Sequence, residues 1–314
     1  MIRPHGHEAA DSIDSALTAS RRGIRAVTLS FAALTSTALL QLIVVAATGS
    51  VALLADTIHN FADALTAIPL LLAFRLGRRP PNRRYTYGYR RAEDVAGIVV
   101  LTVIALSAVV AVWQAVDRLV DPQALENVGF LLVAGPIGFV GNEAVARYRI
   151  REGNAIGSAA LVADGYHART DGFTSLAVAL GAVGVWAGFE RADPIIGLVI
   201  AVAIMGVLRG AARQIYYRLM DAVDPAIVDH IETVAATTDG VHRVGSTKVR
   251  WVGHRLLADV SIVVAGDVNV RVGHGTAEEV RHHLLHDVPH LDEVHVHVDP
   301  DDEDAHRRVA DHVR

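Results

Sequence analysis

The stretch LLADTIHNFADALT, Leu53–Thr66, places Asp56, His59 and Asp63 inside a long apolar segment. Ionisable groups are costly in a bilayer or a dry protein core, so they mark a position that needs them. The same pattern returns in LVADGYHARTDGFT, Leu161–Thr174, and both copies read L-x-A-D-x-x-H-x-x-x-D-x-x-T. An accidental match at all these offsets is very unlikely, so the two segments form an internal repeat.

Both copies lie in the apolar part of the chain. Hydrophobic residues make up 52% of the 314 residues and gather before Asp221. Apolar segments of about 20 residues match a bilayer core of roughly 30 Å. We therefore predict an α-helical polytopic membrane protein with six transmembrane helices. The predicted spans are Gly23–Thr48, Val51–Leu76, Val95–Val116, Val128–Tyr148, Ile156–Ala187 and Pro194–Ile215.

Arginine predicts the orientation of these spans. The loops on one side, and the ends that share that side, hold most of the arginines before Asp221, whereas the opposite side offers only Arg118 and Arg191. By the positive-inside rule both termini are expected in the cytoplasm, with the protein in the plasma or inner membrane of the cell. The N-terminal tail lacks a signal-peptide pattern, so the first span is expected to remain as an anchor.

Histidine points to a metal site. Of 16 histidines only His59 and His167 fall in the predicted membrane part, one in each copy of the repeat. In each copy an aspartate follows four residues later, which places it on the same helix face. Both histidines lie about 15 Å into their spans from opposite sides, near the bilayer centre. Since the chain has no cysteine, nitrogen and oxygen must bind any metal. His59, Asp63, His167 and Asp171 make a four-ligand set of the kind Zn²⁺ favours.

The leading aspartates of the repeat, Asp56 and Asp164, share this face, and three roles are open for them. They could orient the two histidines as hydrogen-bond acceptors, relay metal or protons, or bond neighbouring helices. The alternative, purely structural interpretation of the repeat is a set of buried polar pairs that only hold helices together. The midplane position favours a metal path instead.

At these residues the chain resembles the cation diffusion facilitator family, the dimeric transporters of zinc and other transition metals. The resemblance covers nearly the whole chain: the two H-x-x-x-D motifs, RRYTYGYRRAED after the second span, GNEAVARYRIR at the end of the fourth, and a C-terminal domain that ends in VHVDP. It implies a homodimer that exports metal by alternating access in exchange for protons. It implies no enzyme and no nucleic-acid partner; membrane lipids surround the spans.

Proton coupling is chemically consistent with this set of ligands, because a protonated imidazole cannot bind metal. Protons and metal would compete for His59 and His167, and histidine titrates near about pH 6.5. Four ligands leave no open position for a catalytic water, and H-E-x-x-H is absent, which argues against a metallohydrolase. Two alternatives stay open: another cargo (Cd²⁺, Fe²⁺, Co²⁺, Ni²⁺ or Mn²⁺), or a membrane metal sensor that moves nothing.

The loop after the second span departs from the family pattern. Members often hold a further metal there with histidine and aspartate, but the matching positions here are Asn82, Tyr85 and Tyr89. Neutral phenols are poor ligands, so this site is predicted to be missing. The arginines of the loop are expected to contact anionic lipid head groups or carboxylates of a partner.

The chain is divided here into an N-terminal cytoplasmic tail (1–20), a transmembrane domain (21–220), a cytoplasmic dimerisation and metal-binding domain (221–300) and an acidic tail (301–314). Both tails are expected to lack regular structure. The third part reads as αββαβ, a small α+β domain with its helices on one sheet face. Its helices are predicted at Pro225–Thr238 and Thr276–Asp287, and the resemblance implies a metallochaperone-like fold.

The last predicted strand contains VHVHVD, which places three valines on one face and His295, His297 and Asp299 on the other. The resemblance implies a second Zn²⁺ site, structural or regulatory, in this domain. Its expected ligands are His242, His274, His297 and Asp299, with Asp259 where another ligand stands. The alternative is a set of solvated histidines on a polar strand face.

Overall fold

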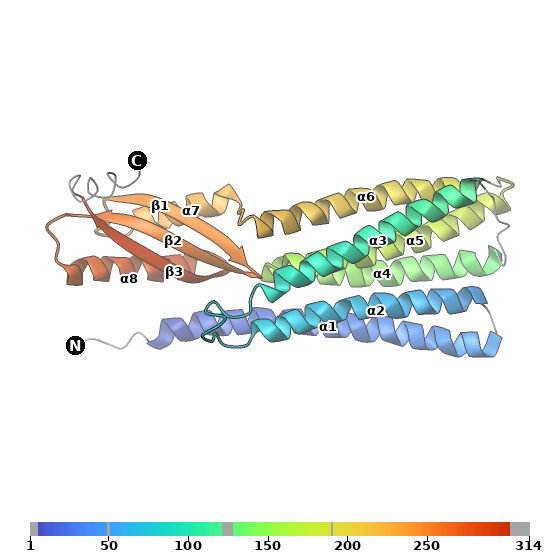
Figure 1. Ribbon diagram of the computed structural model, residues 1–314, viewed down its shortest axis with the longest axis horizontal. Helices are drawn as coiled ribbons and strands as arrows, with labels where there is room; N and C mark the ends of the chain where they lie inside the picture. Colours follow the sequence, from blue (N-terminus) through green and yellow to red (C-terminus); the bar gives the residue numbers. More distant parts are fainter. Residues whose placement is uncertain (1–5, 49–50, 121–127, 190, 302–314) are drawn as a thin grey trace. The chain divides into compact units, whose positions relative to one another are not determined.

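The computed structural model describes residues 6–48, 51–120, 128–189 and 191–301. The side chains at 6–17, 37, 41, 44–48, 51–60, 62–64, 111, 114, 118, 128–130, 133–134 and 193–194 lie outside this description. The described chain forms two compact units, a helical unit over Ala19–Tyr216 and a C-terminal unit that begins at Tyr217. Figure 1 gives the order of the elements. The six long helices are α1 (Gly6–Thr48), α2 (Val51–Gly77), α3 (Ala92–Val120), α4 (Val128–Ile156), α5 (Ala159–Trp186) and α6 (Ala192–Leu219).

These helices overlap the six predicted spans, and the polytopic helical fold is confirmed. Among the described residues, three stretches are long and apolar enough by themselves to cross a membrane: Thr18–Leu40, Ala92–Asp117 and Ile195–Leu219. The expectation that the N-terminal tail lacks regular structure is wrong for its described part, because α1 begins at Gly6.

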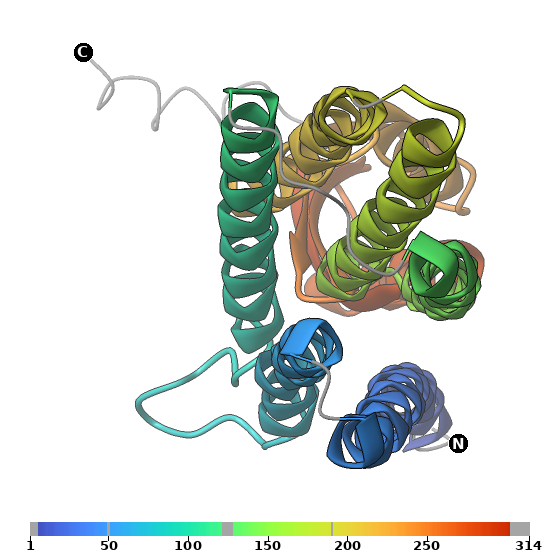
Figure 2. The ribbon, with the colours of Figure 1, turned by 90° about the vertical axis from the view of Figure 1, so that its right-hand side faces the viewer.

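The helical unit is built around small side chains. Ala67, Leu70 and Phe74 of α2 pack with Ala26 of α1 and Leu161 of α5 in one buried cluster. A second cluster joins α3, α5 and α6. Figure 2 shows the helices of this unit close to end-on.

Helices α4 and α5 approach each other closely along their length. A Cβ added at Gly165 of α5 would lie 2.6 Å from Ile150 Cγ1 and 3.1 Å from the Ala146 carbonyl oxygen. A Cβ at Gly135 of α4 would lie 2.6 Å from Ala179 Cβ. Small residues let backbones in a membrane bundle approach this closely. The two helices therefore form a tightly packed antiparallel hairpin.

The turn of this hairpin is well defined. Gly157 has φ +74, a left-handed conformation that glycine adopts without steric cost. Ser158 then caps α5, and its hydroxyl accepts a hydrogen bond from the Leu161 amide at 3.1 Å. Because the cap fixes where α5 begins, it also fixes which way the histidine and aspartates of the second repeat copy point.

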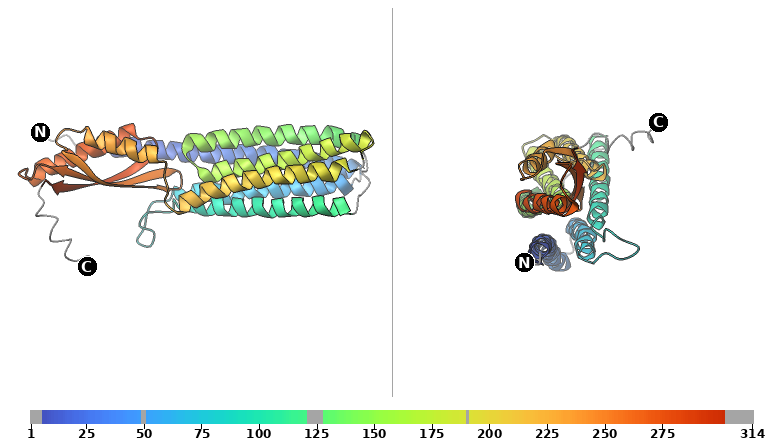
Figure 3. Two further views of the ribbon diagram at one scale, coloured as in Figure 1. Left: turned by 90° about the horizontal axis from the view of Figure 1, so that it is seen from above. Right: turned by 90° about the vertical axis from the view of Figure 1, so that its left-hand side faces the viewer.

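The C-terminal unit has the predicted αββαβ order (Figure 3). It consists of α7 (Pro225–Ala236), β1 (Arg243–Val252), β2 (Arg255–Val264), α8 (Val270–Asp287) and β3 (Leu291–Pro300). The sheet order is β1-β2-β3, with β1 antiparallel and β3 parallel to β2. Alternate residues of β2, among them Val260 and Ile262, share one core with Ile231 of α7 and Leu284 of α8, so both helices cover one sheet face.

Helix α8 begins six residues before the predicted Thr276. Asn269 caps it, accepting a hydrogen bond from the Val272 amide at 3.1 Å. Two glycines in the first turns, Gly273 and Gly275, lower the helix propensity there, which explains why the predicted start was too late. The predicted strand alternation is confirmed: Val294 is buried against the helices, whereas His295 and His297 are exposed on the other face.

A ring cluster marks the start of the C-terminal unit. The Arg218 guanidinium lies 3.8 Å from the centroid of the Trp251 ring and donates a hydrogen bond to the Gly253 carbonyl at 3.0 Å. His290, with φ 66, lies 5.9 Å from Trp251, centroid to centroid. Burial lowers the pKa of His290, and the nearby positive charges of His254 and Arg218 lower it further. The folded unit thus favours the neutral imidazole.

This preference predicts a pH dependence. Unfolded histidine has a pKa of about 6.5, and the folded pKa of His290 is lower. Above the unfolded pKa the difference has no effect on stability. As the pH falls below the unfolded pKa, the unfolded chain binds a proton more readily and the fold loses stability. We expect the His290→Asn variant, whose asparagine tolerates a positive φ, to lose less stability between neutral and acidic pH than the wild type. Hydrogen exchange of β2 and β3 amides in the full-length protein measures this. Equal loss in both proteins would contradict the assignment to His290.

Candidate metal site

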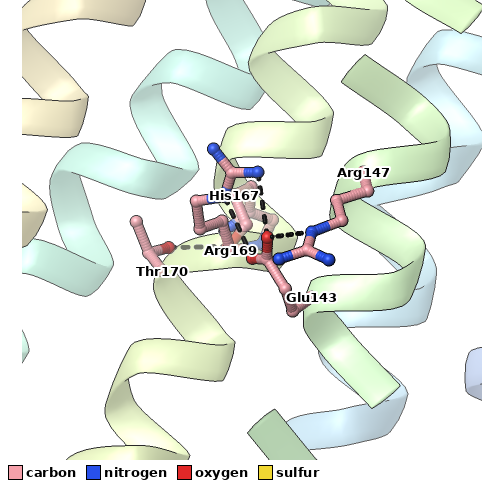
Figure 4. Close-up of polar contacts among 5 residues, drawn as sticks. All are labelled: Glu143, Arg147, His167, Arg169 and Thr170. Carbon is pink, nitrogen blue, oxygen red and sulfur yellow. Dashed lines mark hydrogen bonds and ion pairs between the residues drawn. The ribbon is translucent and has the colours of Figure 1, made fainter. Parts of the chain in front are cut away.

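The second repeat copy places a histidine and an aspartate together inside the helical unit. His167 Nδ1 lies 3.7 Å from Asp171 Oδ2, and the two side chains are 2% and 9% exposed. They are one turn apart on α5, as their spacing predicts. The Thr170 hydroxyl donates to the His167 carbonyl oxygen at 2.7 Å (Figure 4). The result is a buried imidazole–carboxylate pair near the middle of α5.

The first repeat copy lies on α2, but the side chains of Asp56, His59 and Asp63 are outside the described residues. Their approach to His167 and Asp171 therefore stays a prediction. The helices that carry the two copies do pack together, because Leu70 of α2 and Leu161 of α5 belong to one buried cluster.

Asp164 of the second copy has an ion-pair partner on α4. Arg149 Nη1 lies 3.0 Å from Asp164 Oδ2, and the two side chains are 1% and 0% exposed. This contact matches the third of the roles open to Asp164, a bond between neighbouring helices. Arg149 was not among the predicted site residues, because an arginine near the end of a membrane span indicates orientation first.

A second ion pair joins the same helices. Arg169 of α5 donates through Nε to Glu143 Oε2 at 3.0 Å and through Nη2 to Glu143 Oε1 at 3.1 Å. Arg147, one turn along α4, donates to Glu143 Oε1 at 2.8 Å and is 76% exposed. Figure 4 shows this cluster beside His167. Arg169 and Glu143 were not among the predicted site residues, since the repeat pattern leaves their positions unspecified.

The three loop residues at the family's further metal positions contact one another. The Asn82 amide donates to the Tyr89 hydroxyl at 2.7 Å, and its oxygen accepts from the Tyr85 amide at 2.9 Å. The rings of Tyr85 and Tyr89 are 4.5 Å apart between centroids. These side chains therefore organise the loop.

The predicted ligands of the C-terminal unit are only partly brought together. His297 Nε2 lies 3.0 Å from Asp299 Oδ1, and His242 Nδ1 lies 3.4 Å from Asp301 Oδ2. Asp259 pairs instead with His295 at 3.2 Å, and His274 is exposed on α8. Within the ranges that the structure describes, no group of three or more histidines and carboxylates is placed to hold a metal ion.

Comparison with protein families matches almost the whole chain. Residues 27–220 match the cation efflux transmembrane domain, and residues 223–301 match the cytoplasmic domain of cation efflux proteins. The boundary between the two matches follows α6 and precedes α7.

Relatives carry the same description. A probable cation efflux system protein of Mycobacterium tuberculosis is 53% identical over 300 residues, covering 96% of this chain and 90% of the relative. The manganese efflux system protein MneP of Bacillus subtilis is 27% identical over 259 residues, covering 80% and 87%. A solved structure of a MamM variant is 23% identical, covers 25% of this chain and 85% of its own, and has a TM-score of 0.24.

Proposed function

Because the chain belongs to the cation diffusion facilitator family of cation efflux transporters, we propose that it exports Zn²⁺ from the cytoplasm in exchange for protons. Family members move divalent metal ions and are not enzymes. The observation that carries the proposal is the buried pair of His167 and Asp171 inside a helix of the transport domain. Buried ionisable groups in a membrane bundle mark an ion path.

The proposed ligands are His59 and Asp63 of α2 together with His167 and Asp171 of α5. Two imidazole nitrogens and two carboxylate oxygens suit Zn²⁺, which accepts tetrahedral nitrogen and oxygen ligands. Mn²⁺, the ion named for the Bacillus relative, prefers oxygen ligands, so the two imidazoles favour zinc. Asp56 is proposed as a hydrogen-bond acceptor or relay beside His59, because it precedes His59 by three residues on the same helix face.

The exchange mechanism follows from the chemistry of imidazole. A protonated histidine has no free lone pair, so each proton that binds His59 or His167 displaces metal. Where protons flow into the cell, this competition loads the site with metal on the cytoplasmic side and with protons on the outer side. Alternating exposure of one buried site to the two sides then completes the cycle.

The C-terminal unit is proposed to hold two copies of the chain together in the cytoplasm. Its matching domain belongs to the dimeric cation efflux proteins, and dimerisation and metal binding are properties of that domain. A second Zn²⁺ bound there would stabilise the assembled dimer. We place both termini in the cytoplasm, with the arginines of loop 78–91 against anionic lipid head groups.

The test is Zn²⁺ uptake into proteoliposomes that hold the wild-type chain, with and without a pH gradient. We expect uptake that rises with the gradient and stops when a protonophore dissipates it. A chain that binds Zn²⁺ but gives no flux would contradict transport and indicate a metal sensor. Uptake that does not depend on the pH gradient would contradict proton exchange. Faster flux of Cd²⁺, Fe²⁺, Co²⁺, Ni²⁺ or Mn²⁺ than of Zn²⁺ would show that the preferred cargo is another ion.

A further inference from the structure

Arg169 presents an electrostatic problem for a cation site. It lies two residues after His167 and two before Asp171, so a permanently charged guanidinium stands within one turn of both proposed ligands. The first repeat copy has an uncharged residue, Phe61, at the same offset. In a bundle with little water, an uncompensated guanidinium would repel a divalent cation.

Glu143 of α4 supplies the compensation. Its two carboxylate oxygens accept from Arg169 Nε at 3.0 Å and Nη2 at 3.1 Å, the two-point geometry of strong charge-assisted pairs. The side chains are only 27% and 15% exposed, so water screens the pair weakly. The pair therefore compensates the positive charge of Arg169 inside the bundle, close to the proposed ligands His167 and Asp171.

The pair also determines where the guanidinium lies. Residues two apart on a helix point roughly 200° apart, so Arg169 leaves α5 on a different side from His167. That side faces α4, as Figure 4 shows. At this level a Cβ added to Gly172 of α5 would lie only 3.3 Å from Asn142 Cβ, which shows how near the two helices are. Glu143, the residue after Asn142, can therefore reach Arg169 directly.

We propose that Glu143 is a positioning residue for metal transport. Its carboxylate neutralises Arg169 and holds the guanidinium against α4, which keeps that charge from opposing the cation at His167 and Asp171. This inference rests on the proposed transport site and gives Glu143 a role that neither the repeat nor the family resemblance assigns to it. It concerns the affinity of the site for metal.

The experiment measures Zn²⁺ uptake by proteoliposomes of the full chain at varied Zn²⁺ concentration. We expect Glu143→Gln to raise the half-saturating Zn²⁺ concentration about ten-fold, with maximal flux per folded dimer retained. The double variant Glu143→Gln/Arg169→Gln removes both charges and should restore the wild-type value. A pair that only fastened α4 to α5 would leave the double variant as impaired as the single one, and that result would overturn the proposal.

Three further variants make the outcome decisive. Arg147→Gln removes the exposed partner of the same carboxylate and should leave the affinity unchanged, because the pair with Arg169 remains. Arg169→Gln alone should bind Zn²⁺ at least as tightly as the wild type, and it tests the idea even if Glu143→Gln fails to fold; weaker binding would contradict it. His167→Ala tests the site itself. If this variant takes up Zn²⁺ normally, the proposed function is refuted. If it loses uptake but Glu143→Gln keeps the wild-type affinity for Zn²⁺, only this inference is refuted.

Discussion

Zn²⁺ uptake driven by a pH gradient is expected to fall to the leak of protein-free vesicles when His59→Ala and His167→Ala are combined. The double variant removes both imidazoles of the proposed four-ligand site, and the two remaining carboxylates cannot complete a zinc coordination shell. It also removes the groups at which protons and metal compete. Both the flux and its dependence on the gradient should therefore disappear together.

A matched control removes two histidines elsewhere. His282 and His286 lie on α8 of the C-terminal unit, with ring centroids 4.6 Å apart. The His282→Ala/His286→Ala variant should keep gradient-driven uptake, because it leaves the helical unit unchanged. Normal uptake in the His59/His167 variant, measured on protein that elutes as intact dimer, would show that the metal path lies elsewhere.

The second large effect is expected at the buried pair of α4 and α5. Replacing Arg149 with leucine leaves Asp164 as an uncompensated charge with 0% exposure. Removing one partner of a buried ion pair costs about 3–5 kcal/mol, whereas replacing both with apolar residues is often neutral. We therefore expect Arg149→Leu to unfold far more easily than the wild type, and Arg149→Leu/Asp164→Leu to recover most of that stability.

Thermal unfolding of the full-length protein in detergent measures both changes. Arg151→Leu on the same helix is the control, because Arg151 is exposed and its replacement should have little effect. If Arg149→Leu is as stable as the control, the ion pair does not hold the hairpin. Transport by the stable double variant then decides the role of Asp164: retained flux means a bond between helices, and lost flux means a relay or an orienting acceptor.

Periodicity and charge in the sequence were sufficient to predict the architecture. Long apolar segments predicted the helices, and the alternation in VHVHVD predicted which residues of β3 face the core. The pair of His167 and Asp171 also followed from spacing alone, because residues four apart on one helix must be neighbours. Patterns within one element were therefore the reliable ones.

Contacts between elements were harder to predict. Arg149 and Asp164 are 15 positions apart across a turn, and whether they meet depends on how far each helix is rotated. The glycines of α4 and α5 determine that rotation by steric contact, which no charge pattern reveals. Likewise Asp259 faces His295 because of the parallel register of β2 and β3, whereas a resemblance in sequence grouped it with His274 and His297.

The glycine contacts of α4 and α5 have a mechanical consequence. Helices whose backbones interlock at Gly135, Gly165 and Gly172, and which two ion pairs join across the same surface, cannot slide or roll independently. The left-handed turn at Gly157 and the cap at Ser158 restrict the flexibility of the connection between α4 and α5. Any motion that exposes His167 to one side of the membrane must therefore move α4 and α5 together as one rigid body. The degrees of freedom for switching access then lie at the borders of this hairpin with its neighbours.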